Sequence, residues 1–102
     1  MNQYDQFEND SPPMPRVGAL IRAGREAEGL RMASALGLGD NDVEVLILGA
    51  SLAHETEINM HLDSLDIEEV PVLALFEDPR VQCVTWRELT ERLEDYDHVV
   101  TF

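Results

Sequence analysis

The chain has 102 residues, enough for one small domain and too few for two. It carries 21 acidic residues against 7 basic ones, all arginine, for a formal net charge of −14 at pH 7. Such a surface repels nucleic-acid backbones and anionic lipid, so the composition argues against both as partners. Hydrophobic residues make up 44% of the chain, which excludes a disordered acidic tail, and no apolar stretch is long enough to span a membrane.

The N-terminal sequence and the small number of cysteines and histidines predict a cytoplasmic protein. No basic segment precedes an apolar one, so we expect no signal peptide. One cysteine cannot form an internal disulfide, and with three histidines it cannot build a standard structural zinc site. We therefore expect a protein of the cytoplasm with neither a bound metal nor a cofactor.

Residues 1–15 differ from the remainder of the chain. They contain three acidic residues and three prolines and show no apolar periodicity, which predicts a flexible N-terminal tail. Residues 16–102 are predicted to form a single domain.

The first half of that domain alternates apolar runs with segments of helical period. Val17–Ile21 is a predicted strand without polar alternation, as in strands covered on both faces, and Val43–Leu48 is the second predicted strand. Arg25–Leu36 is a predicted helix, and a second helix is expected from about Ala53 to Leu65, with Ser51 as its N-cap.

The second half continues the same alternation. Val70–Phe76 is a predicted strand, and Val81–Val84 a short one. Thr85 and Glu88 match a capping box at the start of a third helix, and His98–Phe102 is the last predicted strand. Trp86 is expected to pack into the core.

This order of elements predicts a three-layer α/β fold. Its sheet should hold about five mostly parallel strands with helices on both faces, wound as in flavodoxin-like domains.

One segment of the chain is electropositive. Residues 16–31 carry a charge of +2, whereas residues 32–102 carry −13. Arg22, Gly24 and Arg25 follow the first strand, at the rim where open α/β sheets bind ligands and where helix N-termini attract anions, so they form a candidate anion site. Gly49 and Ser51 follow the second strand at the same rim. Alternatively, the arginines pair with nearby acidic residues, and Gly49 only allows a tight turn.

His54, Glu57 and His61 have the spacing of one helix face. They border the apolar stripe, so a metal would need ligands from another element or subunit. His54 is also a candidate acid or base if it lies near the Gly49 loop, but a border histidine more often simply packs its ring.

Cys83 is the only thiol and the candidate catalytic residue. Reactive cysteines need an exposed, electropositive setting, and Arg80 and Arg87 flank it. Its neighbours Val81 and Val84 instead favour a buried, inert thiol.

Two pairs of segments carry a family resemblance. Gly29–Leu36 followed by Val43–Gly49 resembles the first helix and second strand of the DsrE/DsrF/DsrH (TusD/TusC/TusB) family of small sulfur-relay proteins. Val70–Asp78 and Val84–Leu89 resemble the DsrH type, with a strand ending in acidic residues, a short hydrophobic strand and a terminal helix. Pro79-Arg80-Val81 stands where that family has Arg-Gly, and Cys83 follows the acidic turn.

The resemblance implies a cytoplasmic DsrE-like domain that forms homo- or hetero-oligomers and passes sulfur between protein partners as a cysteine persulfide. Cys83 would be the sulfurtransferase residue, with Arg80 or Arg87 stabilising the persulfide. The alternative is a non-catalytic oligomeric module of the same fold, whose acidic segments 54–69 and 87–97 bind a basic protein partner.

Overall fold

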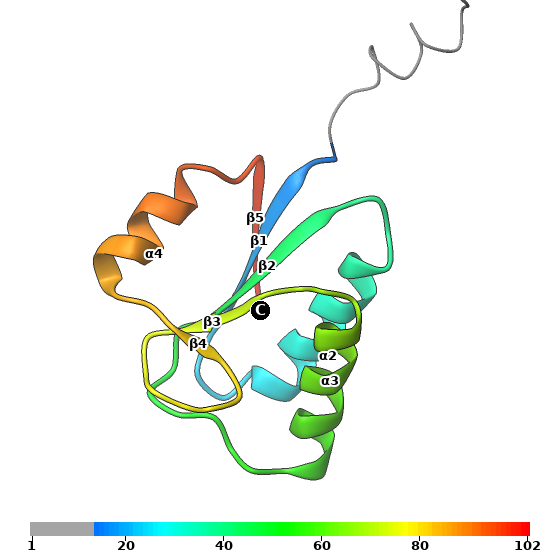
Figure 1. Cartoon of the computed structure of the whole chain (residues 1–102), viewed down its shortest axis with the longest axis vertical. Helices are drawn as coiled ribbons and strands as arrows, with labels where there is room; N and C mark the ends of the chain where they lie inside the picture. Colours follow the sequence, from blue (N-terminus) through cyan, green and yellow to red (C-terminus); the bar gives the residue numbers. More distant parts are fainter. Residues whose placement is uncertain (1–13) are drawn as a thin grey trace, which may run out of the picture.

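The structure of the protein is a computed structural model that describes residues 14–102. The predicted tail falls almost wholly on residues 1–13, outside this range. Along the described chain the elements are β1 (Arg16–Ile21), α2 (Glu26–Gly37), β2 (Asp42–Ile47), α3 (Thr56–Ile67), β3 (Val72–Ala74), β4 (Gln82–Cys83), α4 (Trp86–Leu93) and β5 (His98–Thr101) (Figure 1).

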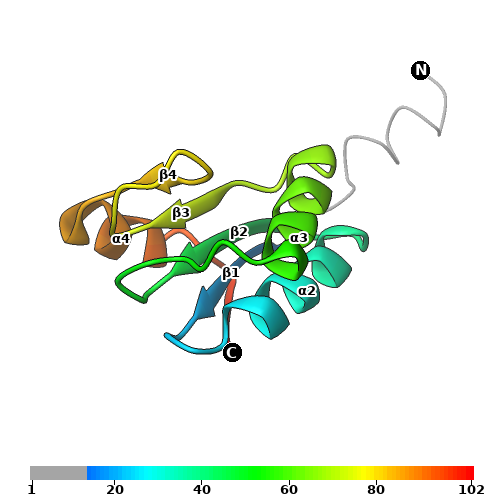
Figure 2. The ribbon, with the colours of Figure 1, turned by 90° about the horizontal axis from the view of Figure 1, so that it is seen from below.

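The five strands form one parallel sheet in the order β4-β3-β2-β1-β5. Strands β1 to β4 lie side by side in chain order. The chain then crosses the whole sheet from β4, and β5 pairs with the other side of β1. This last crossover carries α4 over the opposite face from α2 and α3, as Figure 2 shows. The predicted three-layer α/β fold is confirmed. The order differs from the flavodoxin order 2-1-3-4-5 because the sheet reverses only at its last strand.

Each face of the sheet has its own core, which explains the lack of alternation in the strand sequences. On the α2/α3 face, strand residues such as Val45 and Ile47 pack against Leu30, Ile58 and Leu65 of the helices. On the α4 face the buried residues are Leu46, Leu73, Val84 and Leu89. Apolar strand residues of both parities are therefore buried, and Glu44 of β2 is a polar exception on the α4 face.

A polar cluster ties α4 to the sheet. Glu44 of β2 accepts two hydrogen bonds from Arg92 Nη1, at 2.9 and 2.8 Å, and one from the hydroxyl of Tyr96. Burial, and then the hydrogen bond to Glu44, raise the pKa of Tyr96 above its ordinary value, so the phenol stays a neutral donor. Gly18 of β1 leaves room for the Tyr96 ring, because a Cβ there would lie 2.5 Å from a ring carbon.

Two local expectations from the sequence are wrong. α3 begins at Thr56 rather than near Ala53, and its N-cap is Glu55, not Ser51. The carbonyls of Leu52 and Ala53 accept hydrogen bonds from Arg80 instead of starting a helix. Trp86 is 67% exposed and does not pack into the core.

The capping box at α4 is confirmed. Thr85 Oγ1 accepts a hydrogen bond from the backbone N–H of Glu88 at 3.1 Å, and the Glu88 carboxylate accepts one from the backbone N–H of Thr85. Both groups would otherwise lack an intrahelical partner at the start of the helix.

Replacing Thr85 by alanine is expected to lower the free energy of unfolding by about 1 kcal/mol, because the cap is lost. Thr90 is a matched control: it is also an exposed threonine of α4, but its hydroxyl donates only to carbonyls of the preceding turn. Thr90→Ala should be neutral within about 0.5 kcal/mol. Urea unfolding followed by far-UV circular dichroism measures both, and equal effects would contradict the capping role.

None of the helices in residues 14–102 combines the length and apolarity needed to cross a membrane.

Candidate functional site

A surface groove lies between α3 and the segment Pro79–Gln82. It consists of two adjoining hollows, of about 420 and 320 Å³. Residues common to both hollows are Leu62, Asp66 and Arg80. The groove arises because α3 packs over β2 and β3, whereas both residues of the edge strand β4 stay exposed.

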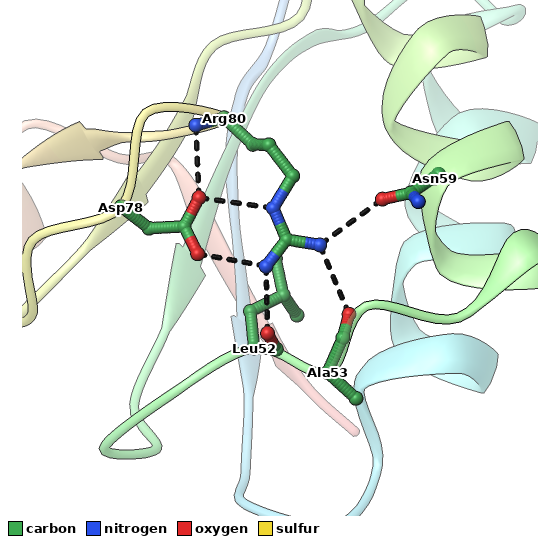
Figure 3. A network of polar contacts seen from close by, with 5 residues as sticks. All are labelled: Leu52, Ala53, Asn59, Asp78 and Arg80. Carbon is green, nitrogen blue, oxygen red and sulfur yellow. Dashed lines mark hydrogen bonds and ion pairs between the residues drawn. The ribbon is translucent and has the colours of Figure 1, made fainter.

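Arg80, which lines both hollows, clamps two loops together (Figure 3). Its Nε and Nη2 donate to the two oxygens of Asp78 at 2.9 and 2.7 Å. Nη2 also donates to the carbonyl of Leu52 at 2.6 Å, and Nη1 donates to the carbonyl of Ala53 at 2.9 Å and to Asn59 Oδ1 at 3.0 Å. The guanidinium thus holds the β2–α3 loop against the β3–β4 loop.

Asp78 neutralises Arg80 in the groove, and two further acidic residues line it. The hydrogen bonds from the Arg80 side chain and backbone are the main reason that the pKa of Asp78 falls to about 2, and His54 lowers it further by its nearby charge. Asp78 therefore stays ionised and compensates Arg80. Asp63 and Asp66, both exposed, are the acidic residues that line the two hollows, and they suit a cationic side chain better than an anion.

The two turns of the predicted anion site lie beside each other, and both of its arginines bind groups of the protein itself. Arg22 donates from Nε to the carbonyl of Phe102 at 2.9 Å, and Arg25 pairs with Glu28 at 2.6 Å. Gly24 has a φ of +86° in the turn between the two arginines, which explains the glycine without a ligand. The alternative, in which the arginines pair with nearby acidic residues, fits the contact of Arg25, whereas Arg22 binds a backbone carbonyl.

Gly49 and Ser51 also lie away from the groove. Gly49 is buried, and a Cβ at this position would lie 3.5 Å from Ala23. The loops that follow β1 and β2 therefore approach each other closely there. Ser51 is exposed and caps no helix. The turns that contain Gly24 and Gly49 thus lie beside each other at the end of the sheet, but neither lines the groove.

His54, Glu57 and His61, which were predicted to share one helix face, do not all lie on α3. His54 precedes the helix and lines the groove, whereas Glu57 and His61 belong to α3. His61 is buried, with Nε2 3.6 Å from Glu57 Oε1. Within residues 14–102, no three His, Cys, Asp or Glu side chains come together in a geometry that could hold a metal ion.

Cys83 lies on the edge strand β4 and is exposed. The expectation that its apolar neighbours would bury it is wrong, because no helix of the described chain covers β4. Around it, Gln82 and Thr85–Glu88 are exposed and only Val84 is buried. Arg80, one of the two arginines expected to face the thiol, instead binds Asp78 and the β2–α3 loop.

The clamp around Arg80 was not found from the sequence. Its signal was Asp78-Pro79-Arg80, a turn in which an acid and a base two residues apart can pair. The other partners are the backbone of residues 52–53 and Asn59, more than twenty positions away, and no local pattern indicates them.

The chain was compared with known proteins on this basis. No protein-family model, no curated protein and no solved structure matches it. What the structure itself establishes is a three-layer α/β domain with a parallel sheet, an exposed thiol on one edge strand and an arginine-clamped groove beside it.

Proposed function

We propose that this protein is a small sulfur carrier of the cytoplasm, which takes up sulfur as a persulfide on Cys83 and passes it to a partner protein. The observation that carries the proposal is the exposure of Cys83, the only thiol of the chain, on the outermost strand of the sheet. Sulfur exchange requires that a second protein's sulfur reach the thiol. The likeness of four segments to the DsrE/DsrF/DsrH family supports the same function.

The step is a transfer without net oxidation. The Cys83 thiolate attacks the terminal sulfur of a donor persulfide, R–S–SH, and a new S–S bond forms as the donor's S–S bond breaks. The products are the Cys83 persulfide and the donor thiolate R–S⁻, so one proton stays with the transferred sulfur. The reverse of this step on a partner's thiolate unloads the carrier.

Two neighbours of Cys83 have roles in this proposal. Because Arg80 is committed to the clamp, Arg87, exposed in the first turn of α4, is the remaining arginine that would stabilise the persulfide on Cys83. Trp86, 67% exposed, offers a large apolar contact for a docking protein. The edge position of β4 leaves room for that protein on the open side of the strand.

The test is persulfide loading of the full-length protein. After incubation with glutathione persulfide, mass spectrometry should show a mass increase of roughly 32 Da, one sulfur atom, that a reducing thiol removes. Cys83→Ser should abolish it. Arg87→Gln should slow loading roughly threefold, while Arg31→Gln, which removes an exposed arginine of α2, should not. The absence of the adduct, or its persistence in Cys83→Ser, would contradict the proposal.

A second candidate is the non-catalytic oligomeric binding module of the same fold. The groove favours it: Asp63 and Asp66 line it, while Asp78 neutralises Arg80, so a basic segment of a partner protein fits there. A protein that fails to load sulfur but binds an arginine-rich peptide, with affinity falling as salt rises, would support this module. Asp66→Asn should then weaken binding and Asp95→Asn, an exposed site on the α4 side, should not.

A further inference from the structure

The strand β5 forms one edge of the sheet, and among residues 14–102 no strand lies beyond it. Its four residues pair with β1 over their whole length, from Val17↔His98 to Leu20↔Thr101. Val99 is 48% exposed, although it stands in a strand of a mostly buried sheet. β5 is thus a regular strand with one partner and one open side.

The hydrogen-bonding groups on that open side can be assigned. Phe102 donates its backbone N–H to Leu20 and accepts from Arg22 through its carbonyl, so its backbone groups face β1. Successive residues of a strand direct these groups to opposite sides. The N–H and C=O groups of Val99 and Thr101 therefore point away from β1, into the space beyond the sheet.

β5 lacks the features by which edge strands avoid pairing. Such edges are usually very short, or carry lysine, proline or a bulge. The opposite edge, β4, has two residues and follows Pro79. In contrast, residues 98–102 contain no charged Asp, Glu, Lys or Arg side chain and no proline, and two of them are valines.

We propose that two copies of this chain associate by antiparallel pairing of their β5 strands, which joins the two five-stranded sheets into one. A two-fold axis at Val100 sets Val99 of each copy opposite Thr101 of the other. These are the residues whose backbone groups point outward, so each such pair forms two N–H···O hydrogen bonds. Val99 loses its exposure to water in the same step.

The pattern of the edge itself fits a second copy as its occupant, because the outward groups of Val99 and Thr101 are symmetric about Val100. Each chain carries −14, so contact between most of its surfaces brings acidic groups together. The 98–102 stretch is neutral and self-complementary, and the two strands meet there with the least repulsion. The dimer should therefore strengthen as salt screens the remaining charge, opposite to a complex between this acidic protein and a basic partner.

Sedimentation equilibrium of the full-length protein tests the proposal. We expect a reversible monomer–dimer equilibrium whose dissociation constant is at most roughly 1 mM. The dimer should be tighter in roughly 1 M than in roughly 0.1 M NaCl. Val99→Lys should weaken the dimer at least about tenfold. Val99→Pro, which removes one outward N–H, should also weaken it.

Gln82→Lys is the matched control, since it adds the same charge at the other, exposed edge and should leave the dimer intact. A monomer at every concentration, an association that salt weakens, or a dimer that Val99→Lys leaves as strong as before would overturn the proposal. It does not depend on Cys83, because Val99→Lys should leave persulfide loading unchanged.

Discussion

Replacing Arg80 by methionine is expected to lower the free energy of unfolding by about 3 kcal/mol. The substitution leaves the Asp78 carboxylate, whose side chain is only 11% exposed, without its counter-ion. It also removes the donor to the carbonyls of Leu52 and Ala53, which hold the β2–α3 loop in place. Urea unfolding at pH 7, followed by circular dichroism, measures the loss.

Two further arginine variants show whether stability depends on the two parallel hydrogen bonds of the guanidinium or only on its charge. Arg80→Lys keeps the charge but cannot make two parallel bonds to Asp78, so its stability should lie between those of the wild type and Arg80→Met. Arg31→Met removes an exposed arginine of α2 and should change stability by less than about 0.5 kcal/mol. If Arg80→Met proved no more damaging than Arg31→Met, the clamp would not stabilise the fold.

The same pair predicts how stability depends on pH. The pKa of Asp78 is lowered from 3.8 to about 2 in the folded protein. The stabilisation by its ionised form is therefore complete above pH 3.8 and is lost as the pH falls towards 2. The stability difference between wild type and Arg80→Met should shrink over that interval, and a difference that stays constant would contradict the assignment.

Gly18→Ala is expected to destabilise the protein by about 2 kcal/mol. An alanine in a strand normally gains up to about 1 kcal/mol over glycine. Here, however, its Cβ would lie 2.5 and 2.6 Å from two ring carbons of Tyr96. The ring cannot easily move away, because its hydroxyl is bound to Glu44. Overpacking therefore outweighs the gain in backbone entropy.

A double-mutant cycle isolates this contact. In a Tyr96→Ala background the space is free, so adding Gly18→Ala should be neutral or slightly stabilising. Gly49→Ala is the control: it is another buried glycine, but its Cβ would meet nothing closer than 3.5 Å. Thermal unfolding of the four variants measures the coupling, and a Gly18→Ala cost that survives in the Tyr96→Ala background would refute the steric explanation.

Much of the fold followed from local sequence patterns. The segment 17–21 of β1 lacks polar alternation because each face of the sheet has its own core, and the alternation of strands and helices indicated the three layers. The capping box of α4 was visible because all of its atoms lie within four residues. Sequence also placed both ends of α2 within one residue.

Features that depend on distant contacts were not predictable. Ser51 looked like an N-cap, but Arg80 holds the backbone that follows it, and α3 therefore starts later. Cys83 looked buried because valines surround it, yet its exposure is set by the strand order, which puts β4 at the edge. For the same reason the groove beside α3 could not be found from spacing alone.

The pairing of β5 with β1 also has a kinetic consequence. It joins residues about eighty positions apart, with Arg16 bound to Asp97 across a separation of 81. Contacts of such sequence separation form late, because a long loop must be closed before they contribute. Until β5 docks, β1 is itself an edge strand with one bare side. A chain in which β5 has not yet docked therefore exposes an apolar open edge on a four-stranded sheet, and such an edge favours aggregation.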